Sequence, residues 1–262
     1  MPLLFATQHS FQNSYYLEVI VLIKIESFGL TDTGRVREEN QDTFHIDEQR
    51  GLYIVADGLG GLQDGARASQ YIVKALAKKI EKDYSAEAES NPCNIPKLLS
   101  KALFEINAKL SEALGGRSGS TVVMTFLKGN TAYLLNVGDS PAYLYRQETL
   151  RRLTQEHNVA GILVEQGKIT AEEARIHPLR HQLTSYVGLK KAMIQYESTL
   201  TLEQGDRLLL CSDGLNGMLD ENEIEKILSS GLDVEGTVKA LIQEANEAGG
   251  IDNITALIIA IS

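Results

Sequence analysis

Four segments of this 262-residue sequence place an aspartate beside a small residue where a strand-like stretch ends or begins. The aspartates are Asp57, Asp139, Asp213 and Asp252. Each segment alone could be an ordinary turn, because aspartate and glycine are common turn residues. Carboxylates gathered at adjacent strand ends repel one another unless a cation compensates them, and ligands that are all oxygen select hard ions such as Mg²⁺ or Mn²⁺. The pattern therefore predicts a fold in which strand ends meet at a metal site.

The turn after Asp57 has glycines at Gly58, Gly60 and Gly61. Glycine adopts backbone angles closed to other residues and lets a ligand approach the main chain, so this turn is suited to hold either a phosphate or a metal ion. The preceding carboxylate favours a cation. The alternative is a tight turn that only closes a hairpin.

Strand-like and helix-like segments come in blocks along the chain. We expect strands at 16–29, 42–47, 52–56, in three runs within 120–154, and at 193–202, 206–211 and 253–261. Amphipathic helices are expected at 66–82, 95–114, 221–229 and 234–248. Strict alternation of strand and helix is missing, so the layering favours antiparallel sheets covered by helices, an α+β fold.

One domain is expected over residues 1–262, because no linker or low-complexity tract divides the chain. Within it, residues 155–188 are polar and helical and interrupt the series of strands. We interpret them as a mobile flap inserted beside the site. Residues 1–20 have no helical period or targeting signal, and we expect them to form an extra, dispensable N-terminal segment.

The charge and the cysteine content limit the classes of binding partner and the cellular compartment that we expect. With 25 basic and 35 acidic residues the formal charge is -10, which disfavours binding to nucleic acid or an anionic membrane. No apolar run approaches the roughly 20 residues that a spanning helix needs. Cys93 and Cys211 have no metal-ligand spacing, and a reducing cytoplasm suits them best. The five histidines lack the spacing of a zinc site.

A hydrolytic chemistry is compatible with these residues. Two hard ions ~4 Å apart share a water, lower its pKa and direct it at phosphorus. The loop 33–42 places Arg35 and Arg37 next to further acidic residues, and a guanidinium binds two phosphate oxygens at once. Arg37 is the preferred phosphate ligand and Arg35 its rival; the alternative is an exposed charged loop with no binding role.

The order of these motifs resembles the metal-dependent PP2C-type (PPM) serine/threonine phosphatases, with the bacterial branch closest, over about residues 29–261. The motifs that carry the resemblance are Arg37-x-x-Asn40-Gln41-Asp42, Val55-Ala56-Asp57-Gly58-Leu59-Gly60-Gly61, Gly119-Ser120-Thr121, Val137-Gly138-Asp139-Ser140, Leu153-Thr154-Gln155-Glu156-His157, Cys211-Ser212-Asp213-Gly214-Leu215 and Gly249-Gly250-Ile251-Asp252-Asn253-Ile254-Thr255.

The resemblance implies a four-layer αββα sandwich of two antiparallel sheets flanked by helix pairs, with two Mn²⁺ or Mg²⁺ ions at one end. Asp57 resembles the ligand that bridges both ions, and Gly58 the residue that offers its carbonyl to one of them. Asp213 and Asp252 resemble terminal ligands.

By the same resemblance, Asp139 is a ligand of a third, weaker ion. Asp42 acts through metal-bound water, and Arg37 holds the substrate phosphate. The implied activity is hydrolysis of phosphoserine and phosphothreonine on proteins phosphorylated by a cognate kinase, by a cytoplasmic monomer.

Some residues depart from the family pattern. Animal members carry a histidine, regarded as a general acid, where this chain has Leu59, so a leaving group here takes its proton elsewhere. His157 is a candidate only by residue type, and we favour a structural role. Two other functions fit the sequence less well. A catalytically dead module would lose the four aspartates, and an EF-hand-like calcium loop needs alternating ligands closed by a glutamate, which the chain lacks.

Overall fold

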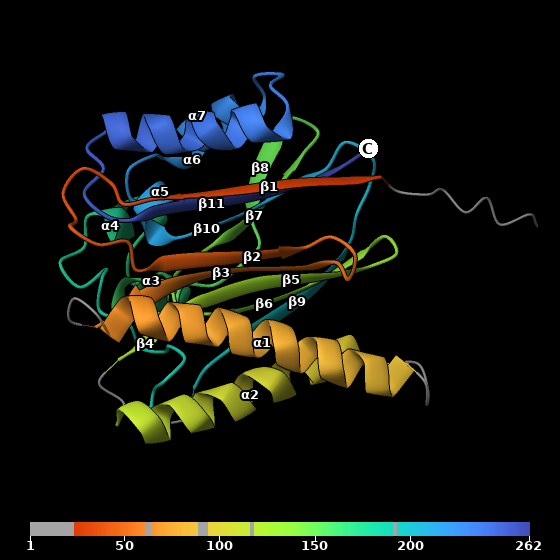
Figure 1. The fold of residues 1–262 in the computed structure, drawn as a ribbon. Helices are drawn as coiled ribbons and strands as arrows, with labels where there is room; N and C mark the ends of the chain where they lie inside the picture. Colours follow the sequence, from red (N-terminus) through yellow and green to blue (C-terminus); the bar gives the residue numbers. More distant parts are fainter. Residues whose placement is uncertain (1–23, 61–63, 89–93, 116–117, 191–192) are drawn as a thin grey trace, which may run out of the picture.

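The computed structural model describes residues 24–60, 64–88, 94–115, 118–190 and 193–262 (Figure 1). The predicted N-terminal segment 1–20 and the first residues of the strand predicted at 16–29 lie outside the described residues. The strands are β1 Ile25–Asp32, β2 Asp42–Asp47, β3 Leu52–Leu59, β4 Gly119–Ser120, β5 Val122–Lys128, β6 Thr131–Val137, β7 Ala142–Arg146, β8 Thr149–Arg152, β9 Tyr196–Thr201, β10 Arg207–Cys211 and β11 Ile254–Ile261. The helices are α1 Asp64–Ala88, α2 Ile95–Leu114, α3 Val159–Glu165, α4 Ala171–Arg175, α5 Asp213–Asn216, α6 Glu221–Leu228 and α7 Val234–Glu247.

The strands form two sheets in which neighbouring strands run antiparallel. One sheet has the order β1-β11-β10-β7-β8, and the other has the order β2-β3-β5-β6-β9 with β4 paired to β3. The β2–β3 pair is the hairpin that the sequence predicts. The two sheets lie face to face (Figure 1).

Alternation along the central strands explains why both faces of each sheet are buried. On β3, Tyr53 and Val55 enter the core between the sheets, while Ile54 faces the layer of α1 and α2. On β11, Leu257 enters the same central core, while Ile258 packs with α6 and α7. Sequence runs that look uniformly apolar are therefore central strands buried on both sides.

Helix pairs cover the two outer faces. Figure 1 shows α1 and α2 beneath the six-stranded sheet and α6 and α7 above the five-stranded one. Helix α2 has the predicted bounds: the Asn94 side chain accepts a hydrogen bond from the Lys97 backbone N–H at its start, and Gly115 ends it with φ of 65°. The predicted four-layer αββα sandwich is confirmed.

Some boundaries differ from the prediction. Strand β1 continues to Asp32, and α1 runs six residues past the predicted Lys82. The third run within 120–154 is two strands, β7 and β8, because Gln147 and Glu148 turn the chain with φ of 50° and 62°. Neither is a glycine, so the sequence gives no sign of this turn.

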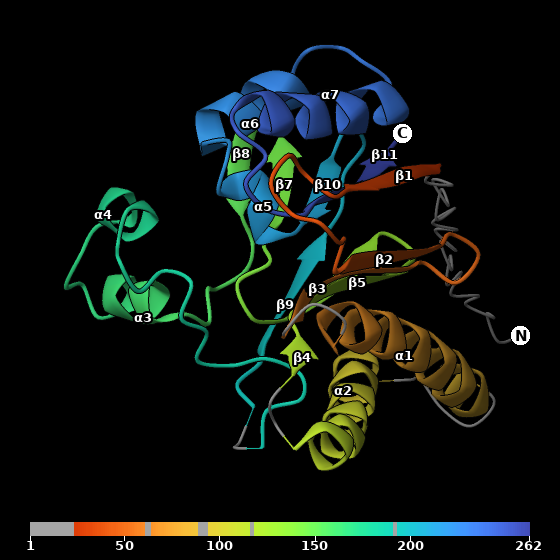
Figure 2. The ribbon, with the colours of Figure 1, turned by 60° about the vertical axis from the view of Figure 1, so that its left-hand side comes forward.

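The segment 155–188 is partly helical as predicted. It contains the short helices α3 and α4, and Figure 2 shows them to one side of the sandwich, outside both helical layers. None of the helices in the described ranges has the length and apolar character to cross a bilayer.

Candidate metal centre

Two of the expected site residues face each other across the β2–β3 hairpin. Asp42, the first residue of β2, is the register partner of Asp57 near the end of β3. The Thr121 hydroxyl accepts a hydrogen bond from the Asp57 backbone N–H at 3.0 Å, and the Ser120 hydroxyl donates to the Asp57 carbonyl at 2.7 Å. The end of β4 and the residue that links it to β5 thereby fix the backbone that carries the Asp57 carboxylate.

Three more aspartates reach this end of the sandwich from other strands. Asp139 lies in the turn between β6 and β7, Asp213 begins α5 directly after β10, and Asp252 precedes β11. Burial raises the pKa of the Asp57 carboxyl well above its ordinary value, and the negative charges of the other four aspartates raise it further, with Asp42 the largest of these contributions. Five carboxylates from both sheets therefore share one electrostatic environment.

The Asp42 carboxylate is buried, and its two oxygens differ in their hydrogen bonds. Its Oδ2 accepts hydrogen bonds from the hydroxyls of Ser212 at 2.6 Å and Thr255 at 2.7 Å. Its Oδ1 is buried and has no hydrogen-bond partner among the described residues. Burial, with smaller contributions from the charges of Asp213 and Asp252, raises the pKa of Asp42 to about 7. An unpartnered buried carboxylate oxygen is a place where a cation or a water completes the site.

Asp139 is held by the start of the predicted flap. The Asn158 amide donates to Asp139 Oδ2 at 3.3 Å and to Glu156 Oε2 at 3.2 Å, while its oxygen accepts from the Gly161 N–H and caps α3. Burial, and next the charge of Asp213, raises the pKa of Asp139 to about 7. One side chain thus joins Asp139 to the first helix of segment 155–188.

Gly58 permits a close approach of two backbones behind Asp57. A Cβ at Gly58 would lie 2.3 Å from the Gly65 carbonyl oxygen and 2.7 Å from that of Gln41, and the Gly58 N–H donates to the latter at 3.1 Å. The first turn of α1 therefore packs directly on the end of β3. A side chain at Gly58 would therefore push the helix away from the end of β3.

The arginine loop is tied to the Asp252 segment. Arg37 Nη2 lies 2.8 Å from Asp252 Oδ2, and the Arg37 side chain is 54% exposed. The Asn253 side chain accepts from the Gln41 N–H and donates to the carbonyls of Thr33 and Glu39, which fixes both ends of the loop. Only one of the five guanidinium N–H groups is used by Asp252, so Arg37 can still bind an anion.

The residues at this end of the sandwich fit hard divalent ions. The groups gathered here are carboxylates, which are ligands that Mg²⁺ and Mn²⁺ prefer. In the part of the chain that the structure describes, no three carboxylate, imidazole or thiol side chains converge closely enough to form a complete cage. Hard divalent ions that retain several waters need few direct protein ligands.

The histidines occupy different positions around the site. His157 is buried, its Nδ1 accepts from the Gly138 N–H, and burial lowers its pKa, in keeping with the expected structural role. His181 was not anticipated. Its Nδ1 lies 3.8 Å from Asp213 Oδ2, and that carboxylate raises the pKa of His181. Leu59 is the last residue of β3, and its aliphatic side chain cannot act as a general acid.

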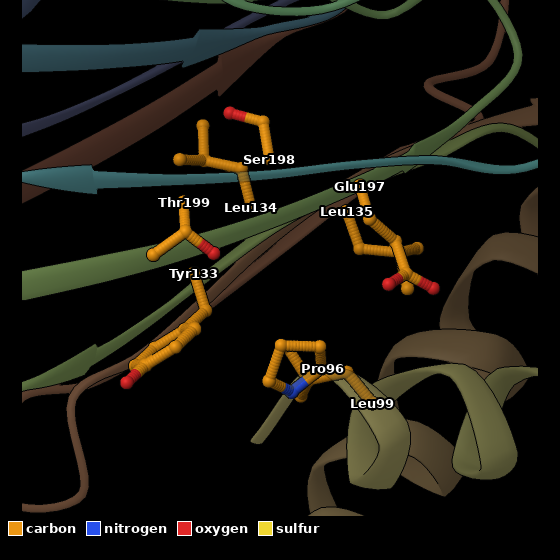
Figure 3. A pocket seen from close by; sticks show the side chains of 8 residues that line it. All are labelled: Pro96, Leu99, Tyr133, Leu134, Leu135, Glu197, Ser198 and Thr199. Atoms are coloured by element: carbon orange, nitrogen blue, oxygen red, sulfur yellow. The ribbon is translucent and has the colours of Figure 1, made fainter. Parts of the chain in front are cut away.

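A pocket of about 250 Å³ lies elsewhere, between the first turn of α2 and strands β6 and β9 (Figure 3). Its lining residues are Pro96, Leu99, Tyr133, Leu134, Leu135, Glu197, Ser198 and Thr199. None of the aspartates described above borders it. We therefore take the carboxylate cluster, and not this pocket, as the functional site.

Comparison with known proteins identifies the architecture around this site. The family model described as "Protein phosphatase 2C" matches residues 34–249. The chain belongs to the protein phosphatase 2C family. Asp252 lies just beyond the matched segment, and the structure places it against Arg37.

Relatives of this family resemble the chain over most of its length. A serine/threonine phosphatase stp of Listeria welshimeri is 34% identical over 240 residues, which cover 87% of this chain and 93% of the relative. The crystal structure of the serine/threonine phosphatase Stp1 from Staphylococcus aureus matches with a TM-score of 0.82 and 29% identity, covering 91% of this chain and 96% of the other.

A further protein phosphatase 2C-like structure was determined with metal. The catalytic domain of the serine/threonine protein phosphatase PstP, in complex with two manganese ions, matches with a TM-score of 0.75 and 26% identity, covering 91% of this chain and 99% of that one. The fold described above is therefore one that holds two manganese ions in a related protein.

Proposed function

We propose that this protein is a protein-serine/threonine phosphatase that hydrolyses phosphoserine and phosphothreonine at a binuclear Mn²⁺ or Mg²⁺ centre. The observation that carries the proposal is the meeting of five aspartates from both sheets with the guanidinium of Arg37 at one end of the sandwich. Membership of the protein phosphatase 2C family supports it. When bound, the two ions supply Lewis acidity, which neutralises the charges of the site and activates water toward phosphorus.

The ligand roles are assigned by position. Asp57, at the centre of the cluster, is the proposed bridging ligand, and the adjacent Gly58 offers its carbonyl. Asp213 and Asp252 are proposed as terminal ligands of one ion. Asp139, held by Asn158, is proposed as a ligand of a third ion.

The remaining residues act on the substrate and on water. Arg37 binds the phosphate through the N–H groups that Asp252 leaves free, and so aligns phosphorus with the incoming water. Asp42, fixed by two hydroxyls, orients a water through its unpartnered Oδ1. The water oxygen forms the new bond to phosphorus and gives up a proton, the bond between phosphorus and the serine or threonine oxygen breaks, and that oxygen gains a proton in exchange, so the alcohol and inorganic phosphate leave.

We also propose that the substrates are proteins phosphorylated by a cognate Ser/Thr kinase, and that the enzyme works as a cytoplasmic monomer. The free thiol of Cys211, buried in the core, suits a reducing compartment. Residues 155–188 are the proposed flap. Size-exclusion chromatography with light scattering tests the monomer directly.

Metal-dependent turnover of a phosphothreonine peptide tests the function. The peptide should lose phosphate in Mn²⁺ or Mg²⁺ and not in excess EDTA. Asp57→Asn should abolish turnover while circular dichroism shows an intact fold, because the carboxylate lies at a strand end outside the apolar core. Full turnover in EDTA, or a wild-type rate for Asp57→Asn, would refute the proposal.

A further inference from the structure

Two exposed apolar side chains stand beside the proposed phosphate ligand. Val36, which precedes Arg37, is 64% exposed, and Ile251, which precedes Asp252, is 49% exposed. Single exposed apolar side chains are common, but two that adjoin the residues of a proposed phosphate site are available to contact a substrate. We call Val36 and Ile251 the rim pair.

Hydrogen bonds on both sides of the rim pair hold its two members together. The Arg35 N–H donates to the Gly250 carbonyl at 2.7 Å, and Arg37 Nη2 contacts Asp252 Oδ2 at 2.8 Å. In the chain, Val36 lies between Arg35 and Arg37, and Ile251 lies between Gly250 and Asp252. The two segments therefore run alongside each other, with the rim pair at the middle position of each.

The backbones of these segments approach too closely for side chains at the neighbouring positions. A Cβ at Gly34 would lie 2.2 Å from the Asp252 carbonyl oxygen, and one at Gly250 would lie 2.9 Å from Arg35 Cγ. Both glycines have positive φ, of 81° and 52°. The rim pair is thus carried by two segments whose backbones pack directly on each other, and its members adjoin Arg37 and Asp252 in the chain.

We propose that the rim pair selects phosphoprotein substrates with a bulky aliphatic residue next to the phosphorylated serine or threonine. This inference rests on the proposed function, because Arg37 must hold the phosphate for the neighbouring substrate residue to meet the rim pair. A substrate chain anchored at Arg37 continues over the adjacent surface, where Val36 and Ile251 offer aliphatic carbon. The chain's net charge of -10 and the neighbouring carboxylate of Glu38 disfavour an acidic residue at the same place.

A series of phosphothreonine peptides tests this selection. The peptides share one sequence and differ only in the residue next to phosphothreonine, which is leucine, glycine, lysine or glutamate, before or after it in turn. In Mn²⁺, the wild type should show kcat/KM roughly three- to tenfold higher for leucine than for glycine on at least one side, as expected for a partly exposed aliphatic contact. Val36→Ser and Ile251→Ser should each lower this ratio toward one.

Control variants separate a local effect from a general one. Leu232→Ser changes another exposed aliphatic residue, in the connection between α6 and α7, and should keep the wild-type ratio. Val36→Leu should raise it. Melting temperatures of all variants, measured beside the kinetics, identify any that fail to fold, and either serine variant alone suffices for the test.

The outcomes distinguish this inference from the proposed function. If all peptides are hydrolysed equally, or if the leucine preference survives both serine variants, the function stands and the selection by the rim pair is wrong. If lysine is preferred and neither serine variant alters this preference, then net charge selects the substrate. That outcome also overturns selection by the rim pair. If no peptide is hydrolysed in Mn²⁺ or Mg²⁺, both the function and the inference fail.

Discussion

Replacing Asp42 by asparagine should stabilise the metal-free protein while abolishing its activity. The ionised Asp42 carboxylate is buried, and its Oδ1 has no partner among the described residues. Burial raises its pKa from 3.8 to about 7, which corresponds to about 4 kcal/mol of unfavourable free energy for the ionised form. An asparagine keeps an oxygen for Ser212 and Thr255 but buries an unpaired amide N–H₂, at a cost of about 1–3 kcal/mol.

The net gain should be about 1–3 kcal/mol above neutral pH, or a melting temperature raised by roughly 3–10 °C for a protein of this size. The raised pKa of Asp42 decides how stability changes with pH. Between pH 3.8 and about 7 the folded protein holds a proton that the unfolded chain has released, so the contribution of Asp42 to stability falls as pH rises across this window. Near pH 4.5 the raised pKa costs the folded protein only about 1 kcal/mol, so Asp42→Asn should bring no gain or a small loss there, whereas the gain should be complete above pH 7.

Thermal unfolding in EDTA at about pH 4.5 and 7.5 measures this gain. Asp47→Asn is the matched control, because Asp47 ends the same strand β2 and makes an exposed contact with Arg50. Burial acts to raise the pKa of Asp47, but hydrogen bonds from Arg50 outweigh it and lower the pKa, so Asp47→Asn should cost less than about 1 kcal/mol. Excess Mn²⁺ should shrink the gain from Asp42→Asn, since cations favour the carboxylate. A lower metal-free melting temperature for Asp42→Asn at pH 7.5, or an equal gain at both pH values, would refute the reasoning.

Three further predictions concern the phosphate, the flap and the sheet. Arg37→Lys should raise KM about tenfold with kcat less affected, because one charge-assisted hydrogen bond of ~1.5 kcal/mol is lost; unchanged steady-state kinetics would move the phosphate elsewhere. Shortening the flap within 159–175 should reduce turnover of a phosphoprotein more than that of p-nitrophenyl phosphate, and equal losses would argue against a flap that contacts substrate. Arg146→Ala should destabilise the fold by about 3–5 kcal/mol in urea unfolding, because it leaves the buried Asp206, held in two contacts of 2.7 and 2.6 Å, without its cation. The exposed Arg50→Ala should cost less than about 1 kcal/mol, and similar losses for both variants would contradict this.

Elements with a local signal were predictable from the sequence. Helix α2 has an amphipathic period, a capping asparagine before it and a glycine after it, and its predicted bounds agree with the structure. The hairpin of β2 and β3 was found because its strands are short, apolar and close in sequence. The turn at Gln147 and Glu148 was missed, because these residues have no preference for positive φ and only the pairing of β7 with β8 requires it.

The expected site residues were proposed from recognisable motifs, and the structure brings the aspartates among them to one end of the sandwich, but the contacts that hold them could not be predicted. Asp42 depends on hydroxyls 170 and 213 residues away in the chain, at Ser212 and Thr255. Both residues stand within the quoted motifs, but a motif in the sequence does not tell which distant carboxylate a hydroxyl contacts. The approach of His181 to Asp213 likewise depends on how segment 155–188 folds back, which no local pattern specifies.

The position of the site at the junction of the two sheets has a physical consequence for folding. Asp57 comes from the six-stranded sheet and Asp139 from the connection that links the two sheets, whereas Asp213 and Asp252 lie next to the ends of β10 and β11 in the five-stranded sheet. The charges meet only when the central core closes, so the apolar packing between the sheets must offset their repulsion. The same closure brings the hydroxyls of Ser212 and Thr255 to Asp42 on the opposite sheet. Closing the sandwich therefore builds the metal-binding site, and the repulsion stored there favours the binding of divalent cations.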